Sequence, residues 1–405
     1  MTAERMVIVG GGGAGDSAAF GLRDEGFDGE IVVISADPDR PYDRPYLSKE
    51  FLRGEVDVPK VYLREEGAYA QGRIELRLGQ RVSGGSLADR RLTLSGGGEL
   101  AYDTLLLATG GTPRWLPGVP RVGNVFTLRS LADGRRLRDA LQGSTRVLLV
   151  GAGFIGAEVA ASARALGKEV LLVEAAPVPL GRALGAEVGK VYASIHSDHG
   201  VAVRSDTTVT EWHLAGDRVV AVNLSDGSRE EADLVVLGTG IEPNLEVAAA
   251  LGLPTEAGGV VVDEGLRAAD GVYVAGDIAY HRHPVLGRQI RVEHWEVAKG
   301  HGAGVARAVA AGHGPYATLP YFWSDQYDVS LEYRGQASGE HELAWRGDRE
   351  ALKFSVFYLR EGLVDAVLSM NDGATNETAE ALIQKRVKVA AAALADPGTD
   401  LSALG

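Results

Sequence analysis

Two glycine-rich strings constrain the fold of this 405-residue chain more than any other feature of its sequence. Gly10-x-Gly12-x-x-Gly15 follows the apolar run Met6 to Val9, and Gly151-x-Gly153-x-x-Gly156 follows the run Val147 to Val150. Each string opens a stretch of helical pattern. Glycine is needed there because a side chain would block the tight turn, the approach of a pyrophosphate and the packing of helix on strand. One such string is weak evidence, but two in the same strand–helix context predict two dinucleotide-binding folds.

The order of the predicted strands indicates that the second fold is inserted into the first. Further apolar runs typical of buried strands are Ile31–Ile34, Leu105–Leu107, Val170–Glu174, Val235–Leu237 and Val272–Val274. We therefore predict an α/β protein with two Rossmann-like three-layer domains, one inserted in the other. Residues 1–111 and 242–315 would form the first, discontinuous domain, and residues 112–241 would form the inserted domain.

From residue 316 to residue 405 the pattern changes. The runs Leu352 to Leu359 and Leu363 to Leu368 alternate around a turn, as in a hairpin, and a helical stretch from Ala374 to Arg386 follows them. This part is predicted to be a small C-terminal α+β domain.

Composition excludes several classes of function. The chain contains no cysteine, which removes disulfides, thiolate metal sites and thiol nucleophiles, and we predict no metal site. Its net charge of -14 argues against nucleic acid as a partner. No apolar run is long enough to span a membrane, and Met1 to Arg5 leads into a strand without a secretory signal. A cytoplasmic location is expected.

An acidic residue after the second strand of such a fold binds the ribose hydroxyls of the dinucleotide. After the second glycine string that residue is Glu174, and Ala175 and Ala176 follow it, so no adjacent arginine is present for a 2′-phosphate. This favours NADH over NADPH, although a strand-end glutamate in solvent would look the same. After the first string the equivalent position is Ser35, with Asp37 two residues later, so an acidic ribose contact is not predicted there.

Several strings, taken in order, resemble the NADH-dependent ferredoxin reductases that serve bacterial cytochrome P450 and ring-hydroxylating dioxygenase systems. Besides the two glycine strings and Glu158, they are Arg40-Pro41-Tyr42-Asp43-Arg44-Pro45-Tyr46-Leu47-Ser48-Lys49, Ala108-Thr109-Gly110-Gly111, Ala275-Gly276-Asp277 and Phe322-Trp323-Ser324-Asp325-Gln326. The resemblance extends over essentially the whole chain. Rubredoxin reductases and apoptosis-inducing-factor-like flavoproteins are close relatives of that family.

The resemblance implies that FAD binds the first, split fold and that NADH binds the inserted fold. The FAD contacts that it implies are Gly10, Gly12, Ala14, Gly15, Arg44, Lys49, Val82, Ala108, Thr109, Gly110, Arg129, Asp277, Glu293 and Trp295. The implied NADH contacts are Gly151, Gly153, Phe154, Ile155, Gly156, Glu174 and Gly240.

Lys49, Glu158 and Trp323 are the candidate catalytic residues. A Lys49–Glu158 pair would hold a cation beside the flavin and stabilise its reduced form, although the two could instead be separate surface charges. Trp323 would lie on the path of the departing electrons. For an acidic chain to dock an acidic ferredoxin it needs a local basic patch, and the predicted patch is His281-Arg282-His283 with Arg288 and Arg291.

The predicted function is therefore a flavoprotein oxidoreductase for electron transfer. It would take hydride from NADH onto FAD and pass single electrons to a [2Fe-2S] ferredoxin; rubredoxin is a second candidate partner. Two alternatives stay open: a redox sensor like the apoptosis-inducing factors, in which NADH binding alters association, and an NADH reductase of a small organic acceptor.

Overall fold

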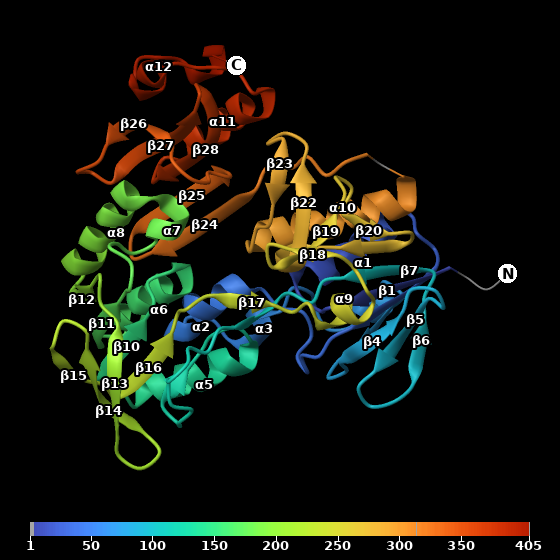
Figure 1. Ribbon diagram of the computed structural model, residues 1–405, viewed down its shortest axis with the longest axis horizontal. Helices are drawn as coiled ribbons and strands as arrows, with labels where there is room; N and C mark the ends of the chain where they lie inside the picture. The colour runs from blue at the N-terminus through green and yellow to red at the C-terminus, as the bar shows by residue number, and fades with distance from the viewer. Residues whose placement is uncertain (1–3, 313, 405) are drawn as a thin grey trace. The chain divides into compact units, whose positions relative to one another are not determined.

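The computed structural model describes residues 4–312 and 314–404, which divide into two compact units. Unit 1 comprises the described residues of Met1–Pro41, Arg64–Gly111 and Pro243–Gly405, and unit 2 comprises Tyr42–Leu63 and Thr112–Glu242. Each unit is organised around a parallel sheet flanked by helices (Figure 1).

The main sheet of unit 1 has six strands in the order β20-β21-β7-β1-β2-β3. They are β1 (Arg5–Val9), β2 (Glu30–Ile34), β3 (Ile74–Arg77), β7 (Thr104–Leu107), β20 (Arg267–Ala269) and β21 (Val272–Val274). All pair in parallel except β20 with β21. Met6 to Val9 are all buried, as expected for a parallel strand that is covered on both faces.

Two helices of unit 1, α1 (Gly13–Asp24) and α10 (Trp295–Ala311), pack against each other at very short range. A Cβ atom on Gly302 of α10 would lie 2.2 Å from the carbonyl oxygen of Ala14 in α1. The contact between the helices is therefore made by backbone, and it places the middle of α10 beside the start of α1.

The remaining elements of unit 1 outside its C-terminal part are short. They are β4 (Val82–Ser86), β5 (Arg91–Leu94) and β6 (Glu99–Ala101), the sheet β18 (Thr255–Glu256), β19 (Gly259–Val262), β22 (Ala279–His283) and β23 (Arg288–Ile290), and the helical segments α4 (Ala68–Gln71), α9 (Glu246–Ala250) and η2 (Gly276–Ile278).

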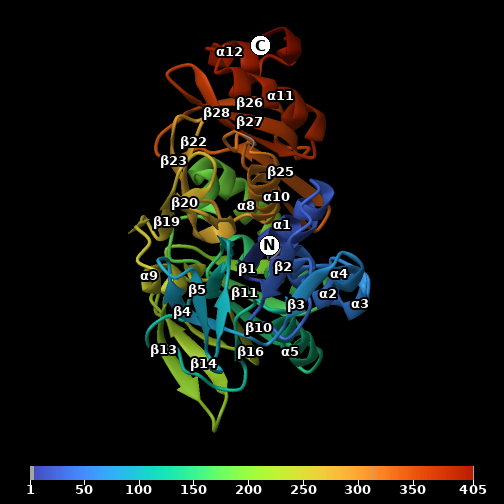
Figure 2. The same cartoon turned by 90° about the vertical axis from the view of Figure 1, so that its right-hand side faces the viewer.

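The C-terminal part of unit 1 is an antiparallel sheet in the order β24-β25-β28-β27-β26, with α11 and α12 packed against it (Figures 1 and 2). Its elements are β24 (Tyr321–Gln326), β25 (Val329–Gly335), β26 (Glu342–Asp348), β27 (Lys353–Arg360), β28 (Leu363–Met370), α11 (Gly373–Lys385), α12 (Ala391–Ala395) and η3 (Leu401–Leu404). The predicted hairpin and the helix that follows it are both present, so the predicted α+β character of this part is confirmed.

Unit 2 repeats the parallel arrangement in a five-stranded sheet of order β12-β11-β10-β16-β9. Side chains of β10 alternate between two cores: Val147 and Leu149 face one core, and Leu148 and Val150 face the other. The first core also contains residues of α5 and α6, and the second contains residues of the small sheet β13-β14-β15. The central strand is therefore buried from both sides.

The bounds of the unit 2 elements are as follows. The sheets contain β9 (Val125–Phe126), β10 (Arg146–Val150), β11 (Glu169–Val173), β12 (Val201–Arg204), β13 (Val209–Leu214), β14 (Val219–Leu224), β15 (Arg229–Glu231) and β16 (Leu234–Leu237), and the helices are η1 (Arg44–Ser48), α2 (Glu50–Arg53), α3 (Val58–Val61), α5 (Leu131–Gln142), α6 (Phe154–Ala165), α7 (Gly181–Leu184) and α8 (Ala186–Asp198). The chain crosses between the units along β8 (Gly111–Pro113) and β17 (Ile241–Pro243).

The structure differs from the predicted domain boundaries over Tyr42–Leu63. This segment belongs to unit 2, whereas residues 1–111 were predicted to lie wholly in the first domain. The reason is apolar burial: Leu47, Phe51 and Val61 are buried in the core that also contains Val147 and Leu149. The crossings at Gly111–Thr112 and Glu242–Pro243 lie within one residue of the predicted ones.

Among residues 4–312 and 314–404, no helix combines the length and the apolar character needed to cross a membrane.

Three buried histidines lie together in unit 1. His281 and His283 on β22 and His301 on α10 are all at most 1% exposed, and the ring centroids of His281 and His301 are 4.9 Å apart. Burial, together with the neighbouring His283, lowers the pKa of His281 to about 3. Burial also lowers the pKa of His301 well below its usual value. Both rings are therefore neutral in the folded protein at pH 7.

This burial predicts that the free energy of unfolding falls as the pH drops below about 6.5, the pKa of histidine in the unfolded chain. Below that pH the unfolded chain binds protons that the folded chain does not, so each such histidine costs up to ~1.4 kcal/mol per pH unit. Urea unfolding of His281→Phe between pH 4.5 and 7.5, at fixed FAD concentration, should show a shallower slope than the wild type. Identical slopes would contradict this account of His281.

Candidate functional site

The predicted FAD residues of unit 1 meet at one edge of its main sheet. The string Gly10–Gly15 follows β1, Ala108–Gly110 follows β7, and Ala275–Asp277 follows β21. These three strands are neighbours and parallel, so their carboxyl ends share an edge, where ligands of such sheets bind. A Cβ atom on Gly10 would lie 2.1 Å from the carbonyl oxygen of Ala108, so the first two strings are in backbone contact.

The first turn of α1 is shaped by Gly15. A Cβ atom at this position would lie 1.9 Å from the carbonyl oxygen of Gly10, so only glycine lets the helix begin this close to the end of β1. Gly12 is the N-cap residue, and the N-terminus of a helix is the end that favours an anion. The Trp295 ring lies beside Gly13, 2.9 Å from where a Cβ atom would stand. Trp295 therefore borders the phosphate-binding turn.

Asp16 places a buried carboxylate in that same turn, and sequence reasoning did not identify it. Arg64 donates to its Oδ2 atom over 2.9 Å, and the hydroxyl of Tyr69 donates to Oδ1 over 2.6 Å. The carboxylate is 5% exposed, so the guanidinium of Arg64 compensates its charge in place of water. This pairing explains how an acidic residue can follow Gly15 directly at a site for an anionic pyrophosphate.

The other predicted FAD residues of unit 1 are placed as follows. Asp277 is buried in η2, and its carbonyl oxygen accepts from Arg291 over 3.1 Å. Glu293 forms an ion pair with the same Arg291. The Val82 side chain lies in the core of unit 1, and its contact with FAD stays a prediction. The Ser35 hydroxyl accepts from the main-chain N–H of Asp37, which holds the turn after β2.

Unit 2 builds a second such site after β10, β11 and β16. Gly151–Gly156 follows β10, and a Cβ atom on Gly156 would lie 2.0 Å from the carbonyl oxygen of Gly151. Gly240 follows β16 with Gly238, which was not predicted: a Cβ atom on Gly151 would lie 2.6 Å from the carbonyl oxygen of Gly238. The sequence feature that could have identified Gly238 is its position directly after the predicted strand Val235–Leu237. Phe154 and Ile155 open α6.

Glu174 lies directly after β11, as predicted, and its carboxylate turns toward the glycine string. Oε2 accepts from the main-chain N–H of Ala152 over 2.6 Å, and Oε1 accepts from that of Ala176 over 2.8 Å. Two charge-assisted hydrogen bonds therefore fix the carboxylate beside the loop. The side chain is only partly exposed, so the interpretation as a freely solvated strand-end glutamate does not hold.

Lys49 and Glu158 form the predicted pair, and it is buried. The ammonium of Lys49 lies 3.4 Å from Oε1 of Glu158, with the two side chains 7% and 5% exposed. The alternative of two separate surface charges is therefore wrong. Ser48, which belongs to the string Arg40 to Lys49 but was not predicted as a site residue, donates its hydroxyl hydrogen to Oε2 of Glu158 over 2.5 Å. No local pattern in the sequence predicts the contact of Ser48 with Glu158, because the two residues are 110 positions apart.

Arg44, Lys49 and Arg129 lie in unit 2, together with the second glycine string. The resemblance assigned these three residues to FAD, which is expected on the split fold of unit 1. Their contacts with FAD stay a prediction.

Trp323 lies on β24, where buried and less buried side chains alternate. Phe322, Ser324 and Gln326 are buried, whereas Trp323 and Asp325 point to the other face of the sheet. The Phe322 ring packs against His294, with centroids 4.2 Å apart. Phe322 therefore anchors the string, and the half-buried ring of Trp323 faces away from that core.

The predicted basic patch is wrong as a free cationic surface. His281 and His283 are buried, and burial lowers the pKa of both. Arg288 donates to the buried carboxylate of Asp365, and Arg291 pairs with Glu293. Arg282 is exposed but lies 3.6 Å from a carboxylate oxygen of Glu264. Sequence proximity grouped these cations, but tertiary contacts bury or neutralise most of them.

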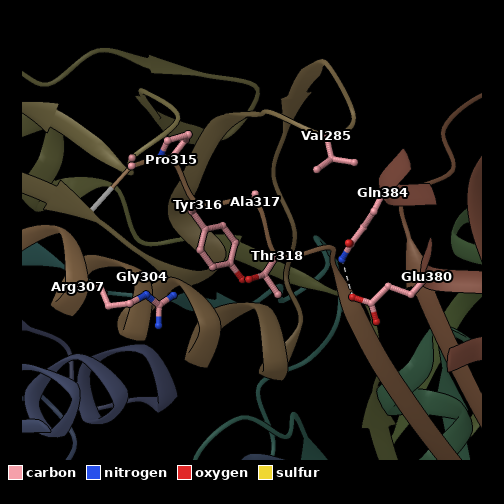
Figure 3. Close-up of a pocket in the computed structure, with 11 residues that line it drawn as sticks. Val285, Gly304, Arg307, Pro315, Tyr316, Ala317, Thr318, Glu380 and Gln384 are labelled. Atoms are coloured by element: carbon pink, nitrogen blue, oxygen red, sulfur yellow. Dashed lines mark hydrogen bonds between the residues drawn. The ribbon is translucent and has the colours of Figure 1, made fainter. Parts of the chain in front are cut away.

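A cavity of about 540 Å³ lies between α10, the segment that follows it and α11 (Figure 3). Tyr316 and Thr318 form part of its wall, and Arg307 borders it from α10. Across the cavity, Gln384 donates to Glu380 over 2.7 Å, as the dashed line shows. None of its lining residues belongs to either glycine string, so it is not the dinucleotide site.

Comparison with known proteins agrees with this geometry. The chain matches the pyridine nucleotide-disulphide oxidoreductase family over residues 4–302. It belongs to this family. Residues 321–405 match the reductase C-terminal family, which agrees with the antiparallel sheet found there. The predicted fold class and the predicted oxidoreductase activity are therefore confirmed.

Similar proteins cover almost the whole chain. The ferredoxin–NAD(+) reductase component of the anthranilate 1,2-dioxygenase system of Burkholderia cepacia is 37% identical over 99% of both chains. Putidaredoxin reductase CamA of Pseudomonas putida is 35% identical over 98% of this chain and 96% of that one. The solved ferredoxin reductase for the CYP199A2 system of Rhodopseudomonas palustris superposes with a TM-score of 0.94 at 35% identity, covering 99% of this chain and 100% of that one. The predicted family resemblance is confirmed.

The family implies FAD and NAD(P)H as cofactors, and the residues present fit both. In each unit a helix begins so close to its strand that no side chain could stand between them, which leaves main-chain N–H groups facing the space for a pyrophosphate. In unit 2 the carboxylate of Glu174 is fixed beside the glycine string, and its contact with a ribose stays a prediction.

Substitutions at two glycines of the second string should have different effects, one on stability and the other on NADH binding. Gly156→Ala should lower the free energy of unfolding by about 1–3 kcal/mol, because its methyl group overlaps the backbone at Gly151. Gly153→Ala should leave stability unchanged, since the nearest atom to its Cβ is 3.8 Å away, but should weaken NADH binding by filling the space for the pyrophosphate. Urea unfolding and NADH titration of both variants test this. Equal destabilisation of the two would refute it.

Proposed function

We propose that this protein is a flavoprotein NADH:ferredoxin reductase that supplies single electrons to an oxygenase system. One observation carries the proposal: two dinucleotide sites are built in a chain that contains no cysteine. Without a thiol pair, no internal disulfide can accept electrons, so they must leave for an external acceptor. Relatives that match nearly the whole chain are named as ferredoxin reductases, and one solved relative is a covalent putidaredoxin reductase–putidaredoxin complex.

Bound FAD would supply two-electron chemistry with NADH and one-electron chemistry with ferredoxin, so that one NADH and two oxidised ferredoxins give NAD⁺, one proton and two reduced ferredoxins. The protein supplies binding and electrostatics. The first turns of α1 and α6 bind the two pyrophosphates, and Glu174 accepts from the ribose hydroxyls of NADH. Lys49 provides a cation for the reduced cofactor, and the buried carboxylate of Glu158 lies 3.4 Å from that ammonium.

The acceptor proposed is a small [2Fe-2S] ferredoxin. With a net charge of -14 and no free cationic patch at residues 281–291, attraction between whole surfaces cannot bring an acidic partner to this chain. Recognition therefore depends on local contacts, and we propose that Trp323 contributes an aromatic one.

Anaerobic assays with purified [2Fe-2S] ferredoxins test the function. NADH should reduce at least one ferredoxin in the presence of catalytic amounts of the FAD-loaded protein, and ferricyanide reduction serves as the control for flavin turnover. If ferricyanide is reduced rapidly and no ferredoxin of a broad panel is reduced, the acceptor is wrong.

Glu174→Gln should narrow the preference for NADH over NADPH by about 1–3 kcal/mol. An amide has one acceptor oxygen in place of two, so it cannot accept from the main-chain N–H groups of Ala152 and Ala176 and from the ribose as well. Flavin reduction rates with both nucleotides measure the change. Glu169→Gln, an exposed glutamate at the other end of β11, is the matched control. An unchanged preference in Glu174→Gln would contradict the assignment.

Trp323→Ala should slow ferredoxin reduction about tenfold while ferricyanide reduction stays near the wild-type rate, because aromatic anchors carry much of the binding energy at such interfaces. Trp345→Ala, on β26 of the same sheet, is the control for general damage to the sheet. If Trp323→Ala lowered both reduction rates equally, or if both tryptophan variants had the same effect, Trp323 would have no specific role in electron transfer to ferredoxin.

A further inference from the structure

The turn that follows β21 in unit 1 is held by a side chain of α10. His301 lies near the middle of that helix and is 0% exposed, and its Nδ1 atom accepts from the main-chain N–H of Gly276 over 3.2 Å. Gly276 belongs to the string Ala275–Asp277, in which Asp277 is a predicted FAD contact. His301 is not among the predicted FAD contacts, because it is 25 positions away from Gly276 in the chain.

Gly276 is packed closely at this place. Its φ of +75° is in the left-handed region, and a Cβ atom on it would lie 3.6 Å from the Cβ atoms of both Ala14 in α1 and Ala298 in α10. Ala298 is three residues before His301 and thus on the same face of α10. The turn therefore lies between the first turn of α1 and one face of α10, and the hydrogen bond to His301 fixes the direction of its N–H group.

The same turn is held at two further points. The carbonyl oxygen of Gly276 accepts from the main-chain N–H of Ala279. The carbonyl oxygen of Asp277 accepts from Arg291 over 3.1 Å. Both of these donors lie within the next fifteen residues of the chain, whereas His301 joins the turn to α10, the helix that packs on α1.

The imidazole ring of His301 is neutral and enclosed by other rings. An imidazolium carries a hydrogen on both nitrogens, so Nδ1 can accept only in a neutral ring whose hydrogen is on Nε2. Burial, together with the neighbouring His281, lowers the pKa of His301 well below its usual value, which agrees with this form. The rings of His281 and Tyr316 stand perpendicular to that of His301, with centroids 4.9 and 4.8 Å away. These two rings leave the imidazole little room to turn, so its acceptor stays directed at Gly276.

We propose that His301 is a positioning residue for FAD. Through Nδ1 it holds the Ala275–Asp277 turn against the first turn of α1, so that the two strings form one binding surface before the cofactor arrives. This inference rests on the proposed function only for the assignment of the first, split fold to FAD. It does not depend on NADH or on the identity of the electron acceptor.

The test compares two replacements of similar size at this position. His301→Leu removes the acceptor and should raise the dissociation constant of FAD about tenfold, because the arrangement of the turn that binds FAD is then only partly populated. His301→Asn keeps an acceptor near the position of Nδ1 and should bind FAD within about threefold of the wild type. Serial dilution of the FAD-loaded protein, followed by the fluorescence of released FAD, gives the dissociation constants.

His283→Leu is the matched control. His283 is also a buried histidine of unit 1, and its Nδ1 atom also accepts from a main-chain N–H, that of Leu286, over 3.3 Å. Leu286 belongs to none of the strings that are predicted to bind FAD. Both leucine variants should therefore lower the free energy of unfolding in urea, but only His301→Leu should weaken FAD binding.

The proposal is overturned if His301→Leu binds FAD as tightly as the wild type, or if His301→Asn or His283→Leu loses as much affinity as His301→Leu. If His301→Leu does not fold, His301→Phe, which keeps a planar ring but has no acceptor, allows the same comparison.

These outcomes are separable from failure of the proposed function, because the release of FAD is measured without NADH or ferredoxin. If the variants behave as expected and no ferredoxin is reduced, only the acceptor is wrong.

Discussion

At the third glycine of each dinucleotide string, a backbone carbonyl oxygen occupies the space in which a side chain would begin. A Cβ atom would stand 1.9 Å from the carbonyl oxygen of Gly10 at the first string and 2.0 Å from that of Gly151 at the second. Each helix therefore starts against the end of its strand, with the positive end of its dipole at the space where we propose that a phosphate binds. The neighbouring parallel strands end at the same edge of each sheet. These are β7 and β21 in unit 1 and β11 and β16 in unit 2, and the residues after them lie beside each glycine string.

Three carboxylates at these sites are held by partners within their own unit. Asp16 beside the first string is compensated by Arg64, and Glu158 is compensated by Lys49. Glu174 is held by main-chain N–H groups. Because breaking a buried pair leaves an uncompensated charge, these contacts hold the side chains in one arrangement before any cofactor binds. The name of the family refers to disulphide chemistry, but this chain has no cysteine that could form a disulphide. What it shares with the family is the pair of dinucleotide-binding folds.

Local patterns predicted the features that depend on nearby residues. The strands at Met6–Val9 and Val147–Val150, the two glycine strings, the C-terminal hairpin and the position of Glu174 after its strand all follow from periodicity and turn chemistry. Features that depend on distant residues were missed or mistaken. Tyr42–Leu63 joins unit 2 because its apolar side chains complete a core formed a hundred residues later, and no pattern within the segment shows this. The basic patch failed for the same reason, since Arg288 meets Asp365 from the C-terminal sheet. Ser48 became visible only once α6 placed Glu158 against it.

In the proposed function the bound flavin is the two-electron centre of this oxidoreductase, and NADH reduces it. An anaerobic titration of the FAD-loaded protein with NADH, followed by the flavin absorbance, tests this most directly. The flavin band should be fully bleached after one equivalent of NADH per FAD, because a chain without cysteine has no thiol pair to take up further electrons. An end point near two equivalents, or a flavin that NADH does not bleach, would contradict it.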